Sequence, residues 1–496
     1  MASFDIVLAR QKNSPASLGR SATVCCFLPA TIWFNLGVPS ENIGLSQPAP
    51  AENGLAPKLG PFDATLIVMG GIIGAGIFKN PAVVARLVHT PAMALGAWII
   101  GGALALIGAF IYAELAVLRP RVCGQYAYLR DAYHPIVAFL YGWVLLLVIQ
   151  TGGMAAVAII FADYLRELTG IGLSSKVIAI TTLAVLTAIN CFGVRAGSNV
   201  QNALMLIKIA AIAGLIGVGW TVSPAGTAPV VAAAGSGGLG GMTAAMVPVI
   251  FAYGGWQTAS FLTGEMRNPR RDLPRGLVIG VLGVIALYLG VTFICIRALG
   301  IDGLAATKIP ASEVMRLAMG ATGARLIALG IAVSTAGFLS QSVLTAPRVY
   351  YAMARDGLFF KAVGRLDRRT KAPVVAIVLQ SALAACIALW VDYSQILDYV
   401  VSIDVIFFGL TAASLFVFRS REKGKPAGTG NSPVFRVPGH PFTTAIFVLV
   451  CWAVSIHSIW TSPKNAGGGV IILLIGFFVY WFWDGKAVPE RSDPSG

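Results

Sequence analysis

Long apolar runs separated by short polar segments dominate the chain from residue 61 onward. A transmembrane helix needs about 20 mainly apolar residues, and most of these runs reach that length. The pattern therefore predicts an all-α integral membrane protein with about twelve transmembrane helices. The predicted spans cover residues 62–87, 91–118, 134–165, 176–193, 200–222, 242–265, 274–298, 325–353, 373–390, 396–418, 441–460 and 466–483.

Glycines interrupt the first and the sixth of these spans. Residues 70–78 read Gly-Gly-Ile-Ile-Gly-Ala-Gly-Ile-Phe, and residues 252–256 read Ala-Tyr-Gly-Gly-Trp. Each glycine weakens a helix by about 1 kcal/mol relative to alanine, and in hydrocarbon an opened backbone persists only where protein or a watery cavity surrounds it. Interruptions at matching positions of two halves mark the substrate site of secondary transporters. The sequence thus predicts a 5+5 inverted repeat with broken first and sixth helices, followed by two C-terminal helices.

The ends of the chain lack such runs. Residues 1–58 are mixed in Ser, Pro, Asn and Gly, and their apolar patch is too short to span a membrane. We expect residues 1–58 to form a disordered cytoplasmic extension, residues 59–485 the transmembrane permease domain, and residues 486–496 a cytoplasmic tail. A cleaved signal peptide fits poorly because the apolar patch lies late, and a misassigned start codon would explain the extension equally well.

Composition and charge place the protein in a membrane. The chain is 57% hydrophobic and 11% charged with a mean hydropathy of +0.79, which excludes a soluble globular protein. The net charge of +15 does not require a nucleic acid partner, because most of the 36 Lys and Arg residues fall on one side of the predicted spans when both termini are cytoplasmic. We expect a multi-pass protein of the cytoplasmic membrane. The cysteines and histidines show no ligand spacing, so neither a metal nor a cofactor is expected.

The first interruption offers backbone N–H groups at the start of its outer half-helix, near Gly74, Ala75, Gly76 and Ile77. These groups and the positive end of the helix dipole favour a carboxylate. The alternative is close helix packing through small residues.

The second interruption offers freed carbonyl groups, which favour a cation such as an ammonium group. Phe251, Tyr253 or Trp256 would then cover the bound solute. The alternative is an aromatic cluster within an ordinary helix core.

Charged residues inside or beside the spans are further candidates. Lys208 lies within the fifth span, where an ammonium group is costly without partners, and the alternative is a side chain that snorkels to the surface. Asp404 lies in the tenth span, and the sequence names no partner for it. Charges at span ends are expected to form surface or gate ion pairs, and these are Glu114, Glu265, Arg267, Arg270 and Arg271.

Several of these motifs together resemble the amino acid–polyamine–organocation superfamily, most closely its L-type and cationic amino acid transporter branches. Residues 74–78 are similar to its Gly-Ser-Gly-Ile-Phe signature, with Ala75 in place of the frequent serine. Residues 251–274 resemble its sixth helix and the following loop, and residues 112–129 resemble its second helix and the connection to the third. The resemblance covers residues 61–483.

The resemblance implies an amino acid substrate held at both interruptions. The carboxylate would meet Gly74, Ala75 and Gly76, and the ammonium group would meet carbonyls at the residues Ile72, Phe251, Ala252 and Gly254. Sodium-independent members carry a lysine on the fifth helix in place of a bound sodium ion, and Lys208 matches this position. Neither interruption holds an acidic residue, which somewhat favours a neutral substrate.

These expectations combine into a sodium-independent amino acid transporter that works by alternating access, as an antiporter or a proton-linked permease. A sodium-coupled symporter and a non-transporting amino acid sensor on the same fold are the alternatives. An enzyme is not expected, because no nucleophile–base pair is visible. The implied partners are a small-molecule amino acid and the lipid bilayer, while proton coupling and oligomeric state stay open.

Overall fold

The computed structural model describes residues 56–120, 123–224, 239–390, 393–423, 435–461 and 463–484. The predicted tail and all but the last three residues of the predicted N-terminal extension lie outside the described residues. The same is true of most of the segment after the fifth predicted span and of half of the loop after the tenth.

The described part of the chain is helical and contains no β-strand, only an isolated bridge between Leu59 and Met266. Most helices overlap the predicted spans, but the helix at residues 310–345 begins 15 residues before the predicted span 325–353, and the helix at residues 269–306 extends beyond both ends of the predicted span 274–298. In chain order they are α1 (Pro61–Ile72), α2 (Gly76–Val88), α3 (Pro91–Leu118), α4 (Gly124–Ala132), α5 (Pro135–Val144), the π-helix η1 (Leu145–Ile149), α6 (Gln150–Thr169), α7 (Ser175–Cys191), α8 (Val194–Trp220), α9 (Leu239–Tyr253), the 3₁₀ helix η2 (Trp256–Glu265), α10 (Pro269–Ala306), α11 (Pro310–Thr345), α12 (Pro347–Arg355), α13 (Val374–Trp390), α14 (Tyr393–Lys423), α15 (Phe442–Thr461) and α16 (Pro463–Asp484).

The lengths and apolar composition of the helices support a protein that crosses the membrane many times. Among the described residues, 6 helices are long and apolar enough to cross a membrane, and the bent pair α1 and α2 makes up to 7. Four shorter apolar helices add to these, namely Ser175–Cys191, Val374–Leu389, Phe442–His457 and Gly467–Phe482. The total of about twelve stays a prediction, because it counts the shorter helices and the interrupted sixth span as crossings.

Proline and glycine account for several helix boundaries. Pro91 occupies the first turn of α3 and Thr90 caps that helix by accepting a 3.3 Å hydrogen bond from the Met93 N–H. Gly300 adopts a φ of 69° inside α10, so the chain turns there and remains helical beyond the predicted span. Helix α4 was not predicted, because it is short and polar.

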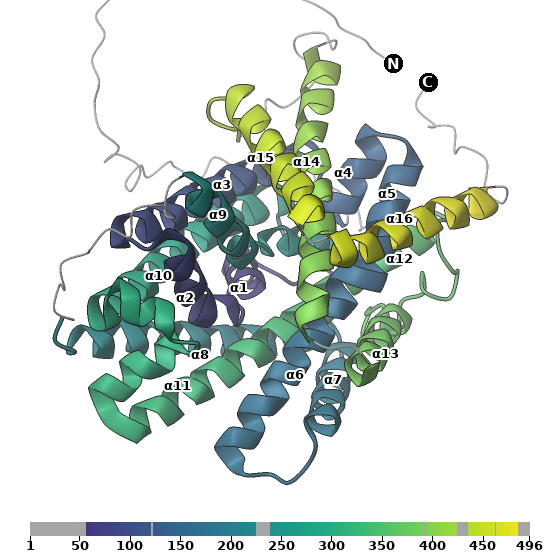
Figure 1. The fold of residues 1–496 in the computed structure, drawn as a ribbon. Helices are drawn as coiled ribbons and strands as arrows, with labels where there is room; N and C mark the ends of the chain where they lie inside the picture. The colour runs from purple at the N-terminus through teal and green to yellow at the C-terminus, as the bar shows by residue number, and fades with distance from the viewer. Residues whose placement is uncertain are drawn as a thin grey trace, which may run out of the picture. The chain divides into compact units, whose positions relative to one another are not determined.

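The helices form two groups that each combine early and late segments of the chain. We call α1, α2, α3, α9, η2 and α10 the central bundle, and α6, α7, α11 and α13 the second group; the members of each group pack on one another. Helix α8 packs against both groups, while α14 packs on α3, α4 and α6 and carries α15 and α16. Figure 1 shows α6, α7 and α13 side by side and the two C-terminal helices beside α14.

Large apolar side chains cover much of the outer surface of the helices. On α8, Leu206 and Ile207 are 51% and 52% exposed, and on the C-terminal helices Trp460 and Phe482 are 84% and 78% exposed. A water-soluble monomer rarely tolerates such extensive exposure of apolar side chains. The surface is therefore suited to contact with lipid.

Candidate functional site

The first break separates α1 from α2 at the centre of the bundle. Helix α1 ends at Ile72, Ile73 has an extended backbone, and the axes of α1 and α2 are bent by 44°. Ile72, Ile73 and Ile77 are buried, whereas Gly74, Ala75 and Gly76 between them are partly exposed. No side chain caps the start of α2, so its first N–H groups have no side-chain acceptor at that helix end.

The second break separates α9 from η2. The chain leaves the α-helix after Tyr253, turns through Gly254 and Gly255, and continues as a 3₁₀ helix. Gly255 has a φ of 104°, a conformation that residues with a side chain rarely adopt. Gly254 and Gly255 are partly exposed, and Phe251 is 37% exposed one turn earlier.

The two breaks lie against each other. A Cβ atom on Gly255 would collide with the Gly71 backbone, and one on Gly71 would collide with the Gly255 carbonyl oxygen. Beyond the breaks, the Asn80 side chain of α2 donates a 2.9 Å hydrogen bond to the Pro248 carbonyl of α9. Two sequence motifs far apart in the chain therefore lie in direct contact, and their glycines permit the close approach.

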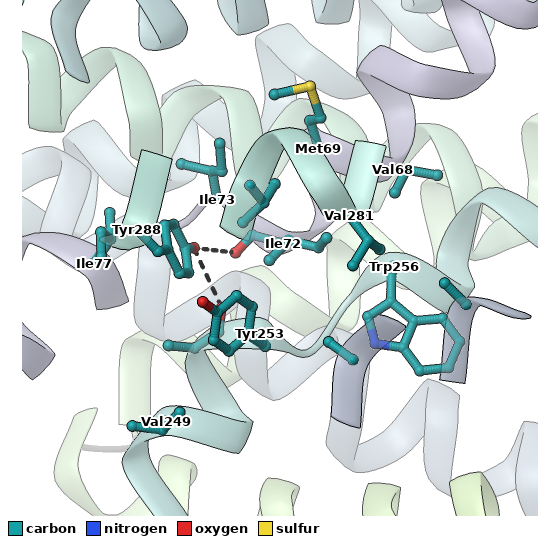
Figure 2. Close-up of a cluster of buried hydrophobic side chains, with 14 of the residues drawn as sticks. Val68, Met69, Ile72, Ile73, Ile77, Val249, Tyr253, Trp256, Val281 and Tyr288 are labelled. Atoms are coloured by element: carbon teal, nitrogen blue, oxygen red, sulfur yellow. Dashed lines mark hydrogen bonds between the residues drawn. The ribbon is translucent and has the colours of Figure 1, made fainter. Parts of the chain in front are cut away.

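Tyr288 of α10 joins the breaks through its hydroxyl group. The oxygen lies 3.1 Å from the Ile72 carbonyl oxygen and 3.2 Å from that of Ala252 (Figure 2). A hydroxyl group has one proton, so it donates to one carbonyl at a time. The sequence analysis did not select Tyr288. The sequence feature that could have identified it is its polar hydroxyl group within the seventh predicted span.

The predicted aromatic residues differ in their surroundings. Tyr253 is buried in a cluster with Trp98 and Tyr288, at ring-centroid distances of 5.7 and 5.1 Å. Trp256 is also buried and packs on Tyr112 at 4.7 Å. Phe251 alone among the three predicted aromatics is substantially exposed.

A small apolar cavity adjoins the second break. It holds about 40 Å³ and lies between α3, α9, α14 and α15, with Tyr253, Gly254 and Trp256 among its lining residues. Val405, Phe408 and Cys451 line its other side.

Lys208 points into the protein. Its side chain is fully buried on α8, and its ammonium group donates a hydrogen bond to the Ile73 carbonyl oxygen in the first break. Gly337 of α11 leaves room for it, because a Cβ atom there would lie 3.3 Å from Nζ. Ser334 of α11 approaches the next carbonyl, that of Gly74, at 3.3 Å. The ammonium group therefore binds the opened backbone and does not reach the membrane surface.

Ion pairs link the helix ends at the side of the bundle where α1 begins. Glu265 at the end of η2 forms a buried two-bond pair with Arg348 of α12, at 3.0 and 3.1 Å. Asp63 of α1 accepts hydrogen bonds from Arg195 at 3.3 Å and Asn202 at 2.6 Å, both on α8. The Leu59 N–H donates to the Glu265 carbonyl oxygen at 2.9 Å, which ties the start of α1 to η2.

The structure pairs the predicted carboxylates with arginines that sequence reasoning did not select. Glu114 binds Arg419 through two hydrogen bonds of 2.7 Å. The expected arginines, Arg267, Arg270 and Arg271, are exposed and form no ion pair within the described part of the chain. Glu114 and Glu265 are both 1% exposed. A buried carboxylate needs a partner because burial removes it from water, so these two residues are not ordinary surface charges.

Comparison with known proteins agrees with this architecture. The sequence model of a family described as amino acid permease matches residues 59–482. The serine/threonine exchanger SteT of Bacillus subtilis is 31% identical over 435 residues, which is 87% of this chain and 97% of SteT. The large neutral amino acids transporter small subunit 2 of Rattus norvegicus is 28% identical, over 90% of this chain and 86% of its own length.

A third relative has a similar level of identity. The b(0,+)-type amino acid transporter 1 of Homo sapiens is 28% identical over 75% of this chain and 78% of its own length. The relatives are named as transporters and an exchanger, and the resemblance of the motifs is confirmed by a family match that spans nearly all of the described helices. The chain therefore belongs to the amino acid permease family.

Proposed function

We propose that this protein is a sodium-independent secondary transporter of amino acids that works by alternating access, with a neutral amino acid as its substrate. The proposed sodium independence is supported by one observation, the hydrogen bond that the Lys208 ammonium group donates to the Ile73 carbonyl oxygen. A fixed cation on α8 binds the opened backbone between α1 and α2, so a sodium ion is not needed to hold these helices together.

The substrate would lie across the two breaks. Backbone N–H groups of Gly74, Ala75, Gly76 and Ile77 would bind its carboxylate, because the uncapped start of α2 offers them at the positive end of a helix dipole. The partial exposure of the first three of these residues supports this assignment.

The ammonium group of the substrate would bind carbonyl groups around the second break. Those of Ile72 and Ala252 already lie near the Tyr288 hydroxyl, and each carbonyl oxygen can accept a second hydrogen bond. The carbonyls of Phe251 and Gly254 would complete the set. Tyr253 and Trp256 would form the buried wall behind it, whereas Phe251 would cover the solute.

The class of substrate is supported by the relatives and by the absence of an acidic residue from the two interruptions. One relative is named a serine/threonine exchanger and another a transporter of large neutral amino acids. Neither name implies a charged side chain on the substrate.

The packing of the helices supports the inverted repeat and about twelve spans. The central bundle combines the broken first and sixth spans with α3 and α10, which are the second and seventh. The second group combines the third and fourth spans with the eighth and ninth. In a repeat of five spans, each span of the first half corresponds to the span five positions later, which is the grouping described here. We infer a permease domain at residues 59–485, with both ends of the chain on the cytoplasmic side.

Transport in proteoliposomes tests the proposal. Purified protein in vesicles preloaded with an unlabelled neutral amino acid should take up the labelled amino acid at the same initial rate in sodium, potassium or choline chloride. Uptake only in sodium would establish the symporter alternative. Saturable binding without counterflow would establish the sensor alternative.

A further inference from the structure

Asp404 of α14 is a buried carboxyl group that the proposed substrate site does not use. Its Oδ1 atom has no accessible surface and no hydrogen-bond partner, although part of the residue as a whole is accessible. No lysine, arginine or histidine among the described residues forms an ion pair with it. A carboxylate inside a membrane protein is costly without a compensating cation.

The inward face of α14 connects Asp404 to the second break. Residues three and four positions apart share one face of a helix, which places Phe407, Phe408 and Thr411 on the face of Asp404. Phe408 stacks on Trp256 at 5.6 Å, and Phe407 packs on Tyr141 at 5.4 Å. Asp404 therefore lies one helical turn from the aromatic contact that holds α14 against the start of η2.

Within the part of the chain that the structure describes, the titratable groups that face Asp404 carry no positive charge. They are Tyr112 on α3, Tyr141 on α5 and Cys451 on α15, which are close enough for electrostatic interaction with its carboxyl group. Phenol and thiol groups are neutral near pH 7.

Several described charged groups on other elements that pack on α14 have partners elsewhere. Arg130 on α4 pairs with Asp131 and Asp356, and Glu114 on α3 pairs with Arg419. Asp163 on α6 accepts a hydrogen bond from Ser175.

We propose that Asp404 is a proton-binding site that links amino acid transport to proton movement. This inference rests on the proposed function and names the coupling ion. In the packed arrangement the carboxyl group holds a proton, because no other cation compensates it among the described residues. When α14 separates from Trp256 and water enters, the carboxyl group is hydrated and releases the proton to that side.

The apolar cavity beside the second break leaves unfilled space against α14. It holds about 40 Å³, but its lining is apolar and offers a water molecule no set of polar partners, so it stays dry in the packed arrangement, which agrees with a protonated carboxyl group there. Val405 and Phe408, which line it, flank Asp404 on the same helix, and Cys451 lines it from α15. One proton enters the carboxyl group from one side and leaves to the other, and no covalent bond other than the O–H bond changes.

The test uses full-length protein in proteoliposomes with a pH-sensitive dye in the lumen. A difference of two pH units is a factor of about 100 in proton activity, so coupling of one proton to each neutral amino acid permits up to about a 100-fold accumulation. With acid outside, the wild type should accumulate the amino acid above its external concentration and acidify the lumen in the same time course.

Three variants locate the proton site. Asp404→Asn mimics the protonated carboxyl group, so it should keep counterflow of labelled against unlabelled amino acid but lose both accumulation and acidification. Asp404→Glu should retain them. Asp302→Asn, which changes an exposed carboxyl group near the end of α10, is the matched control and should behave as wild type.

The outcomes separate this inference from the proposed function. Counterflow without any response of the wild type to the pH gradient would overturn the proton site alone. Accumulation by Asp404→Asn equal to the wild type would also overturn it, because the proton would then be carried elsewhere. Absence of counterflow in the wild type would refute the proposed function and the proton site together.

Discussion

Gly76 has room for one more carbon atom. A Cβ atom there would lie 3.5 Å from Asn80 Nδ2 and 3.7 Å from the Ala252 Cβ, which are ordinary contacts. Gly76→Ala should therefore fold and bind substrate, whereas Gly76→Leu should fill the space of the carboxylate and weaken binding by about tenfold or more, a loss of about 1.4 kcal/mol. Binding of labelled amino acid to both purified variants checks this, and equal affinities would remove Gly76 from the site.

Phe251 is the exposed aromatic residue beside the second break. Because a covering side chain matters most when the site closes, Phe251→Ala should lower the rate of transport more than the affinity for the amino acid. Initial uptake rates and equilibrium binding measure the two effects separately. Phe478→Ala on α16, where the ring is 60% exposed, is the control that should change neither. An unchanged rate for Phe251→Ala would mean that the residue does not cover the substrate.

At the scale of elements, Lys208 holds α8 to the opened backbone between α1 and α2. Lys208→Ala would leave the buried Ile73 carbonyl without this partner, and a hydrogen bond to a charged group contributes about 1.5–3 kcal/mol. The rate of counterflow should fall by about tenfold or more.

Leu206→Ala, on the exposed face of the same helix, is the matched control for Lys208→Ala and should transport normally. Normal counterflow by Lys208→Ala, measured in the absence of sodium, would contradict the role of a fixed cation.

At the scale of the whole molecule, the contacts around the start of α1 tie the central bundle to α8 and α12. Glu265→Gln would leave the Arg348 guanidinium group buried without a charged partner, and breaking a buried ion pair in this way costs about 3–5 kcal/mol. The double variant Glu265→Gln with Arg348→Met should recover part of the thermal stability in detergent. Equal melting temperatures of the wild type and both variants would show that the pair contributes little.

Much of the transmembrane architecture could be predicted from the sequence, because lipid requires long apolar helices and the lengths of these runs are visible in the residues. The predicted bounds of residues 91–118 coincide with α3 (Pro91–Leu118). Both breaks were predicted for the same reason, since glycine clusters weaken a helix locally. The family was recognisable from the short motifs around these breaks.

The partners of the buried polar groups could not be predicted, because they depend on which distant helices meet. Only the packing of α10 on both breaks brings Tyr288 to Ile72 and Ala252. Arg348 lies 83 residues from Glu265, and no local pattern links them. The amino acid sequence by itself determined the apolar helices and their two weak points, through propensity and the needs of a backbone in lipid. Only the tertiary structure decided which side chains satisfy those opened backbones, because hydrogen bonds and ion pairs act over a few ångströms between segments that the fold alone brings together.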